Sequence, residues 1–116
     1  MCHVLIIEDE PLIAMDLQAM LEAEGATSFD IAVTEAEAVD AARAHPPCVI
    51  TSDVRLLEGT GPGAIRTIMA EQADVQVIFI TATPEACDKY EPPMVVLCKP
   101  VRRVSVVESF KLLARL

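Results

Sequence analysis

Four polar features of this chain each follow a short apolar run, and together they could carry out chemistry. They are the Glu8-Asp9 pair, Asp53, Thr81 and Lys99. A short apolar run that ends in turn residues predicts a buried strand. The carboxyl ends of parallel strands lie at one edge of a sheet, so these side chains would converge there. A single acid at a strand end is usually a solvated turn or helix cap, so the prediction rests on the joint placement.

The residue types at this edge are those that phosphoryl transfer needs. Asp53 is the expected nucleophile that accepts a phosphoryl group. Mg²⁺ prefers oxygen ligands, so we expect Asp9 and Asp53 to bind it directly and Glu8 to bind directly or through water. Lys99 would neutralise a second side of the phosphoryl group, and the Thr81 hydroxyl would donate to a third oxygen. Without a metal the clustered acids repel one another, which predicts raised carboxyl pKa values and a counter-ion role for Lys99.

The rest of the chain alternates strand-like and helix-like segments. Strands are expected within residues 4–7, 29–33, 48–53, 75–80 and 94–98. Pro11 is a favoured first residue for the first helix, and Thr34 with Glu37 has the form of a capping box for the second. The last helix is expected to carry an apolar stripe of Val104, Val107, Phe110 and Leu113. Nearly all-apolar strands that alternate with helices predict a doubly wound α/β domain with a parallel sheet covered on both faces.

Composition excludes several classes of function. The chain has 116 residues and a net charge of −9, which argues against direct nucleic-acid binding because phosphates are met by clustered cations. No apolar run is long enough to cross a bilayer, and the N-terminus lacks the layout of a signal peptide. We therefore expect a cytoplasmic protein without membrane contact.

The four cysteines are widely spaced and form no metal-binding pair. They are Cys2, Cys48, Cys87 and Cys98. Cys48 and Cys98 fall in strand-like runs, so we expect small buried side chains in a reducing compartment rather than a disulfide or a zinc site.

The order of these motifs resembles the receiver domain of two-component response regulators. The resemblance rests on Glu8-Asp9, Asp53, Thr81 and Lys99-Pro100 in a chain of five β-α units, and it covers residues 1–116 as one domain. Residues 6–17 are similar to receivers of α-proteobacterial general-stress regulators and their stand-alone relatives, so a single-domain receiver is expected.

The resemblance implies a fold, a reaction and partners. The sheet would have the flavodoxin-like strand order 2-1-3-4-5. Asp53 would take its phosphoryl group from a histidine kinase or a histidine phosphotransfer protein, with Mg²⁺ held by Glu8, Asp9, Asp53 and the backbone carbonyl of Arg55. The domain would be a monomer or a dimer that forms on phosphorylation. It would signal through protein contacts or act as a phosphate sink, and a cis peptide bond before Pro100 is a candidate feature.

Three positions depart from the pattern of the family. Val96 replaces the aromatic residue that commonly precedes the lysine by three positions, and Leu57 replaces a proline that often follows the acceptor. Prolines at both ends of residues 84–93 predict a short or irregular fourth helix. We hypothesise that phosphorylation reshapes this segment instead of rotating an aromatic side chain.

Two alternative functions stay open from the sequence. The first is a Mg²⁺-dependent phosphohydrolase with an aspartyl nucleophile. Such enzymes commonly place a second acid two residues after the nucleophile, where this chain has Arg55. The second is a receiver-like fold that is never phosphorylated, and the intact set of Asp53, Thr81 and Lys99 argues against it.

Overall fold

The computed structural model describes residues 2–82 and 95–114. The elements follow the expected alternation: β1 (His3–Ile7), α1 (Pro11–Ala23), β2 (Ser28–Ala32), α2 (Glu35–Ala44), β3 (Val49–Ser52), α3 (Gly61–Glu71), β4 (Gln76–Thr81), β5 (Val95–Cys98) and α4 (Arg103–Ala114). The expected fourth helix between β4 and β5 lies outside the described residues. In this numbering α4 is therefore the last helix of the chain.

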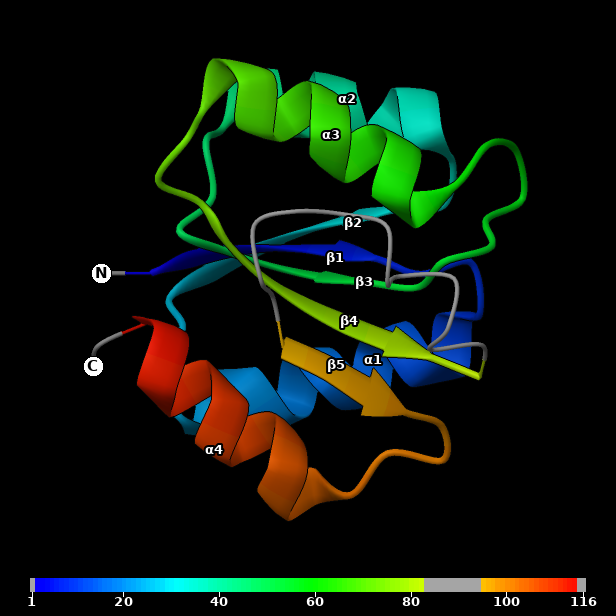
Figure 1. Ribbon diagram of the computed structural model, residues 1–116. Helices are drawn as coiled ribbons and strands as arrows, with labels where there is room; N and C mark the ends of the chain where they lie inside the picture. The colour runs from blue at the N-terminus through cyan, green and yellow to red at the C-terminus, as the bar shows by residue number, and fades with distance from the viewer. Residues whose placement is uncertain (1, 83–94, 115–116) are drawn as a thin grey trace.

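The five strands form one sheet in the order β2-β1-β3-β4-β5, and every neighbouring pair is parallel. The doubly wound α/β fold and its strand order are thus confirmed. In this order β3 lies at the centre between β1 and β4, and β2 and β5 form the two edges of the sheet (Figure 1).

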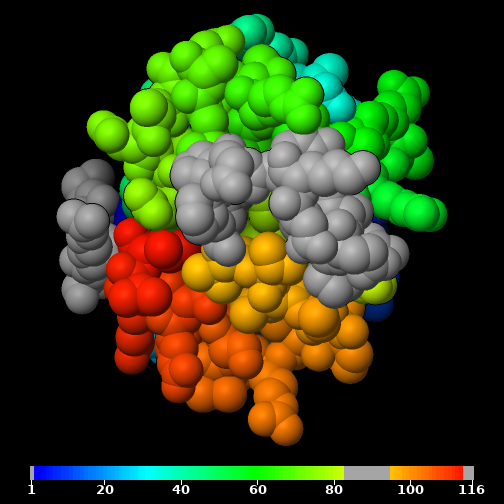
Figure 2. Space-filling view, viewed as in Figure 1, coloured from blue at the N-terminus to red at the C-terminus, as the bar shows by residue number. Residues whose placement is uncertain are grey.

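The helices cover both faces of the sheet. Figure 1 shows α2 and α3 on one face and α1 with α4 on the other. Two apolar clusters fill the spaces between these layers, one around Leu5, Ile50 and Phe79 and the other around Leu21, Ile78 and Phe110. In Figure 2 the loop that follows β3 projects from the surface at the right, where Leu57 is exposed.

Local signals in the sequence set the helix starts. Pro11 is the first residue of α1, as expected. The Thr34 side chain accepts a hydrogen bond from the backbone N–H of Glu37 at the start of α2. The return bond of the expected capping box is displaced, because the Glu37 carboxylate accepts from the N–H of Val33 instead of Thr34. Thr60 caps α3 in the same way, through the N–H of Gly63.

The expected apolar stripe of the last helix is partly wrong. Val106 and Phe110 are buried, whereas Val104 is 54% exposed. The helix carries apolar residues on two overlapping stripes, and helical spacing alone does not decide which stripe faces the sheet.

The expectation of four unpaired cysteines is wrong for one pair. Cys2 and Cys48 form a disulfide, with their Cα atoms 5.8 Å apart. Cys2 immediately precedes β1 and Cys48 precedes β3, and these strands are neighbours in the sheet. The pairing depends on strand order, which the wide spacing in sequence conceals. Cys98 is a free thiol and is exposed rather than buried, while Cys87 lies outside the described residues.

Candidate functional site

The ends of the central strands bring the expected site residues to one edge of the sheet. Glu8 follows β1, Asp53 follows β3, Thr81 ends β4 and Lys99 follows β5. The backbone extends the sheet ladder at these points, because the Asp53 N–H donates to the Ile7 carbonyl and the Lys99 N–H donates to the Thr81 carbonyl, each at 2.9 Å. The predicted convergence is therefore present in the structure.

Asp53 presents a carboxylate that is held at both oxygens. Oδ1 accepts the backbone N–H of Val54 at 2.7 Å, and Oδ2 accepts from Lys99 Nζ at 2.9 Å. The side chain is 12% exposed, so a small part of it is open to solvent. The carboxylate is thus oriented by fixed donors, yet a reactant can still reach it.

Glu8 is the most deeply buried acid of the site, with 2% of its side chain exposed. Burial raises the pKa of Glu8, and the charge of Asp53 adds to this increase. Hydrogen bonds from the Glu10 N–H and from Lys99 oppose the rise without cancelling it. The pKa of Glu8 thus shifts in the predicted direction, but burial rather than repulsion between carboxylates is the main cause.

Lys99 links the two carboxylates. Its Nζ lies 3.1 Å from Glu8 Oε1 and 2.9 Å from Asp53 Oδ2. Burial alone would lower the pKa of Lys99, but the hydrogen bonds to Asp53 and Glu8 outweigh burial and raise it. The ammonium group is thus stabilised as the counter-ion that the sequence predicted.

Thr81 is buried at the last position of β4. Its carbonyl receives the Lys99 N–H, so the threonine and the lysine are neighbours at the same edge. The donor role of the Thr81 hydroxyl stays a prediction.

Three acidic side chains could hold a metal ion at this edge. Ligand oxygens of Glu8, Asp9 and Glu10 all lie within 4.8 Å of one another. A set made only of carboxylate oxygens fits a hard cation such as Mg²⁺. Glu10 was not among the predicted ligands; it lies 3.9 Å from Lys99 Nζ and is largely exposed. The unbroken acidic run of residues 8–10 was the signal that could have identified it.

Two hydrogen bonds hold the main chain of Asp53 and of the loop that follows it. The Ser52 hydroxyl donates to the Asp53 carbonyl at 2.8 Å, and the Gly61 N–H donates to the Val54 carbonyl at 2.8 Å. Arg55 is exposed in this loop and forms an isolated bridge with Thr60. These bonds fix the main chain on both sides of Asp53.

The family of response regulator receiver domains matches residues 4–103. This chain belongs to that family, and its fold is that of a receiver domain. It is 39% identical over 108 residues to the phyllosphere-induced regulator PhyR of Methylorubrum extorquens. That alignment covers 90% of this chain and 40% of PhyR, so the chain spans well under half of that relative.

Solved structures agree with this assignment. The receiver domain of PhyR from Erythrobacter litoralis is 32% identical, with a TM-score of 0.89 over 98% of this chain and 90% of that one. The expected likeness to receivers of general-stress regulators is thereby confirmed. The receiver domain of sensor histidine kinase PA1611 from Pseudomonas aeruginosa, which has magnesium in its active-site cleft, shares the fold at 24% identity. Its TM-score is 0.85 over 99% of this chain and 98% of that one.

Two features bear on how the domain meets other molecules. Val96 lies on β5 with 39% of its surface exposed, at the position where the sequence lacks the family's usual aromatic residue. Among residues 2–82 and 95–114, no helix has the length and apolar character needed to cross a membrane.

Proposed function

We propose that Asp53 is the phosphoacceptor of this receiver and that it takes a phosphoryl group from the phosphohistidine of a kinase or a phosphotransfer protein. The observation that carries this proposal is the Asp53 carboxylate, which is partly open and is paired with Lys99, whose Nζ also contacts Glu8. In the reaction an Asp53 oxygen attacks phosphorus. The phosphorus–nitrogen bond breaks, and its electron pair passes to the donor imidazole.

Each neighbour of Asp53 has a defined part in this reaction. The Val54 N–H and Lys99 each hold one oxygen of the Asp53 carboxylate and so fix its orientation. Lys99 offsets the charge that collects on the phosphoryl oxygens, and the Thr81 hydroxyl donates to one of them. Glu8, Asp9, Asp53 and the Arg55 carbonyl would hold Mg²⁺, and Glu10 would add a further oxygen. A bound Mg²⁺ ion supplies additional positive charge to the phosphoryl group.

The domain acts as a signalling module in this proposal rather than as a phosphohydrolase. Hydrolytic turnover needs a general acid–base group next to the nucleophile. The residue two positions after Asp53 is Arg55, whose guanidinium stays protonated and whose side chain is exposed. The phosphorylated domain would therefore work through protein contacts or as a sink for phosphoryl groups.

A hollow next to Lys99 is the surface on which a protein donor would dock in this proposal. This hollow of about 500 Å³ opens between α1 and the segment that follows β5. Its apolar part includes Ile13, Leu17 and Val101. The partners are proteins of the cytoplasm and not nucleic acids, in keeping with the net charge of −9. The domain is a monomer or a dimer that forms on phosphorylation.

The proposal is tested by incubating the protein with Mg²⁺ and acetyl phosphate and measuring its intact mass. We expect a gain of one phosphoryl group, which Asp53→Asn abolishes. Asp74→Asn, which changes an exposed acid far along the chain, serves as the control and should retain the gain. Omission of Mg²⁺ should slow the reaction strongly. An adduct that persists in Asp53→Asn would exclude this acceptor, and rapid turnover of a small phosphate ester would support the phosphohydrolase instead.

A further inference from the structure

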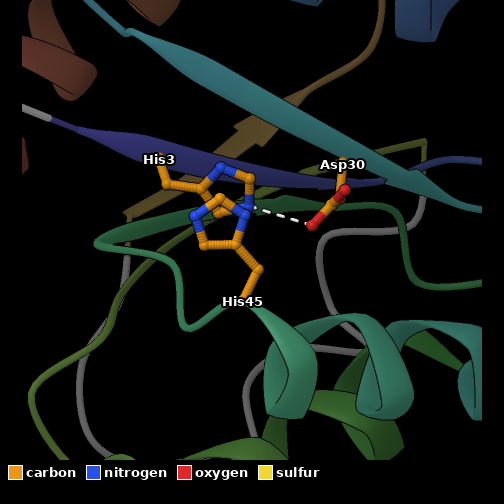
Figure 3. Close-up of side chains that lie close together, drawn as sticks. All are labelled: His3, Asp30 and His45. Atoms are coloured by element: carbon orange, nitrogen blue, oxygen red, sulfur yellow. Dashed lines mark hydrogen bonds and ion pairs between the residues drawn. The ribbon is translucent and has the colours of Figure 1, made fainter.

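Three side chains with metal-ligating atoms lie together at the edge of the sheet opposite to Asp53. They are His3, Asp30 and His45, and their ligand atoms all lie within 4.8 Å of one another (Figure 3). His3 begins β1, whereas Glu8 follows the end of the same strand. Five residues of extended strand separate the two clusters by about 16 Å. This second cluster is therefore distinct from the phosphoacceptor site.

The fold brings the three residues together from separate elements. In the pairing of β1 with β2, His3 lies opposite Ser28 and Leu5 lies opposite Asp30. Alternate residues of a strand face the same side, so Ser28 and Asp30 share the face of the sheet that α2 covers. His45 directly follows α2 and lies over this face. The cluster exists only when β1, β2 and α2 are in place.

We propose that His3, Asp30 and His45 bind a divalent transition-metal ion of the zinc class. Two imidazoles and one carboxylate form a ligand set that Zn²⁺ accepts and that a hard cation such as Mg²⁺ does not prefer. The acidic cluster of Glu8, Asp9 and Glu10 has the opposite character, because it offers oxygen only. The two ends of β1 thus select different cations.

The ring of His3 is already positioned for this role. His3 is 9% exposed, its Nδ1 lies 2.7 Å from Ser28 Oγ, and its Nε2 lies 3.0 Å from Asp30 Oδ2. When Nδ1 donates to the serine oxygen, the lone pair of Nε2 faces the Asp30 carboxylate. In this tautomer Nε2 and an Asp30 oxygen are both available to bind one Zn²⁺ ion, and the hydrogen bond to Ser28 would fix the orientation of the His3 ring.

His45 supplies the third ligand and leaves the site accessible. Its ring stacks on that of His3, with 3.5 Å between the ring centroids and 15° between the planes. His45 is exposed, so its ring can turn about its own side-chain bonds and direct a nitrogen to the ion. Three protein ligands leave one position of a tetrahedral ion for water. An ion pair between His3 and Asp30 alone would not require the His45 ring to lie against His3.

Zinc titration of the tag-free protein tests the proposal. Thiolates also bind zinc, so the titration uses Cys87→Ser/Cys98→Ser protein with the Cys2–Cys48 disulfide intact, and excess Mg²⁺ occupies the acidic cluster. We expect one zinc ion per chain. The chain has two histidines, so the imidazole resonances of both should shift in NMR spectra. His45→Ala and Asp30→Asn should each weaken binding by more than about tenfold.

Matched variants decide between this site and its alternatives. Asp40→Asn changes an exposed acid on the same helix that His45 follows, and it should leave zinc binding unchanged. His45 is exposed, so His45→Ala should fold, which circular dichroism checks. Zinc binding that survives both His45→Ala and Asp30→Asn, or that is lost in Asp9→Asn, would overturn the proposal. The absence of shifts at the two imidazoles would also overturn it. None of these outcomes depends on phosphorylation of Asp53.

Discussion

At the level of single residues, Glu8 has the least favourable position in the phosphoacceptor site. Its carboxylate is buried, and Lys99 forms hydrogen bonds with both Glu8 and Asp53. Isolated buried charges are costly, and partial pairing lowers this cost without removing it. The site therefore holds an excess of negative charge that a cation at this edge would relieve.

Replacing Glu8 should change the pH dependence of stability. The pKa of Glu8 is raised above its ordinary value of 4.5, so the folded protein binds this proton more tightly than the unfolded chain. The contribution of Glu8 to the free energy of unfolding thus falls as the pH rises from 4.5 through the folded-state pKa. In Glu8→Gln this loss disappears, so the variant gains stability relative to the wild type toward neutral pH. Urea unfolding without divalent ions, between about pH 4.5 and 7, measures the difference.

Glu22→Gln is the control for this comparison, because Glu22 is an exposed acid on α1. Lys99 has a raised pKa and stays protonated throughout this range, so it does not contribute to the slope. Parallel pH profiles of the free energy of unfolding for wild type and Glu8→Gln would show that the buried Glu8 carboxylate does not destabilise the folded protein.

The sequence predicted the phosphoacceptor site better than the histidine cluster, for a physical reason. Glu8, Asp53 and Lys99 each follow an apolar run, and the parallel sheet places such positions at one edge whatever its exact register. The contact of His3 with Asp30 depends on the register of β1 against β2. The position of His45 depends further on where α2 ends. Neither is fixed by the spacing of residues along the chain.

At the level of elements, the start of α3 is built against the acceptor. Gly61 is buried, and a Cβ atom there would overlap the Asp53 carbonyl oxygen and the Ser52 hydroxyl. Only a residue without a side chain lets the helix start so close to Asp53. Gly63, two residues further on, would meet side chains only: Glu35 Oε1 would lie 2.6 Å from the new Cβ and the Thr60 hydroxyl 2.9 Å from it.

Gly61→Ala should therefore be far more damaging than Gly63→Ala. Overpacking against fixed backbone typically costs about 1–3 kcal/mol, and here it also displaces the main chain of Asp53. We expect a lower free energy of unfolding and slower phosphorylation by acetyl phosphate. Gly63→Ala should lower stability less than Gly61→Ala, because the atoms that it meets belong to the side chains of Glu35 and Thr60, which can shift, although a shift weakens their bonds at the start of α3. Equal effects of the two substitutions in urea unfolding would show that α3 does not constrain Asp53.

The predicted helix starts agreed with the structure where the sequence has a strong helix-start signal, as at Pro11 and Thr34. They were less certain where apolar residues were plentiful. In α4 the choice between Val104 and Val106 as the inward residue is made by the sheet surface beneath the helix. Such a choice is a tertiary effect, so local periodicity could not reveal it.

At the level of the whole molecule, a disulfide bond joins Cys2 and Cys48, the residues that precede the neighbouring strands β1 and β3. The Cys2–Cys48 disulfide closes a loop of 46 positions at the edge of the sheet where the histidine cluster lies. A loop of this length restricts the unfolded chain, and the chain-entropy estimate of the stabilisation is about 4 kcal/mol. The bond lies at the opposite end of β1 and β3 from Asp53.

Reduction of this disulfide should lower stability without abolishing phosphorylation. In Cys87→Ser/Cys98→Ser protein, a reductant should lower the melting temperature, since Cys2 and Cys48 are then the only cysteines. The mass gain with acetyl phosphate should persist at temperatures where the reduced protein is folded. Identical melting curves with and without reductant, together with two reactive thiols in the untreated protein, would show that the pair is not bonded.

The ion pairs of Lys99 also bear on when the sheet can close during synthesis of the chain. Lys99 and Glu8 lie 91 positions apart in the chain, and the lysine follows the last strand. During synthesis, Glu8 and Asp53 leave the ribosome before Lys99, the cation that bridges them in the described part of the structure. A nascent chain that stops short of β5 would have to bury both carboxylates without that partner, so it has an electrostatic reason not to close its sheet. Closure of the sheet around Asp53 is therefore expected only after β5 and Lys99 have been synthesised.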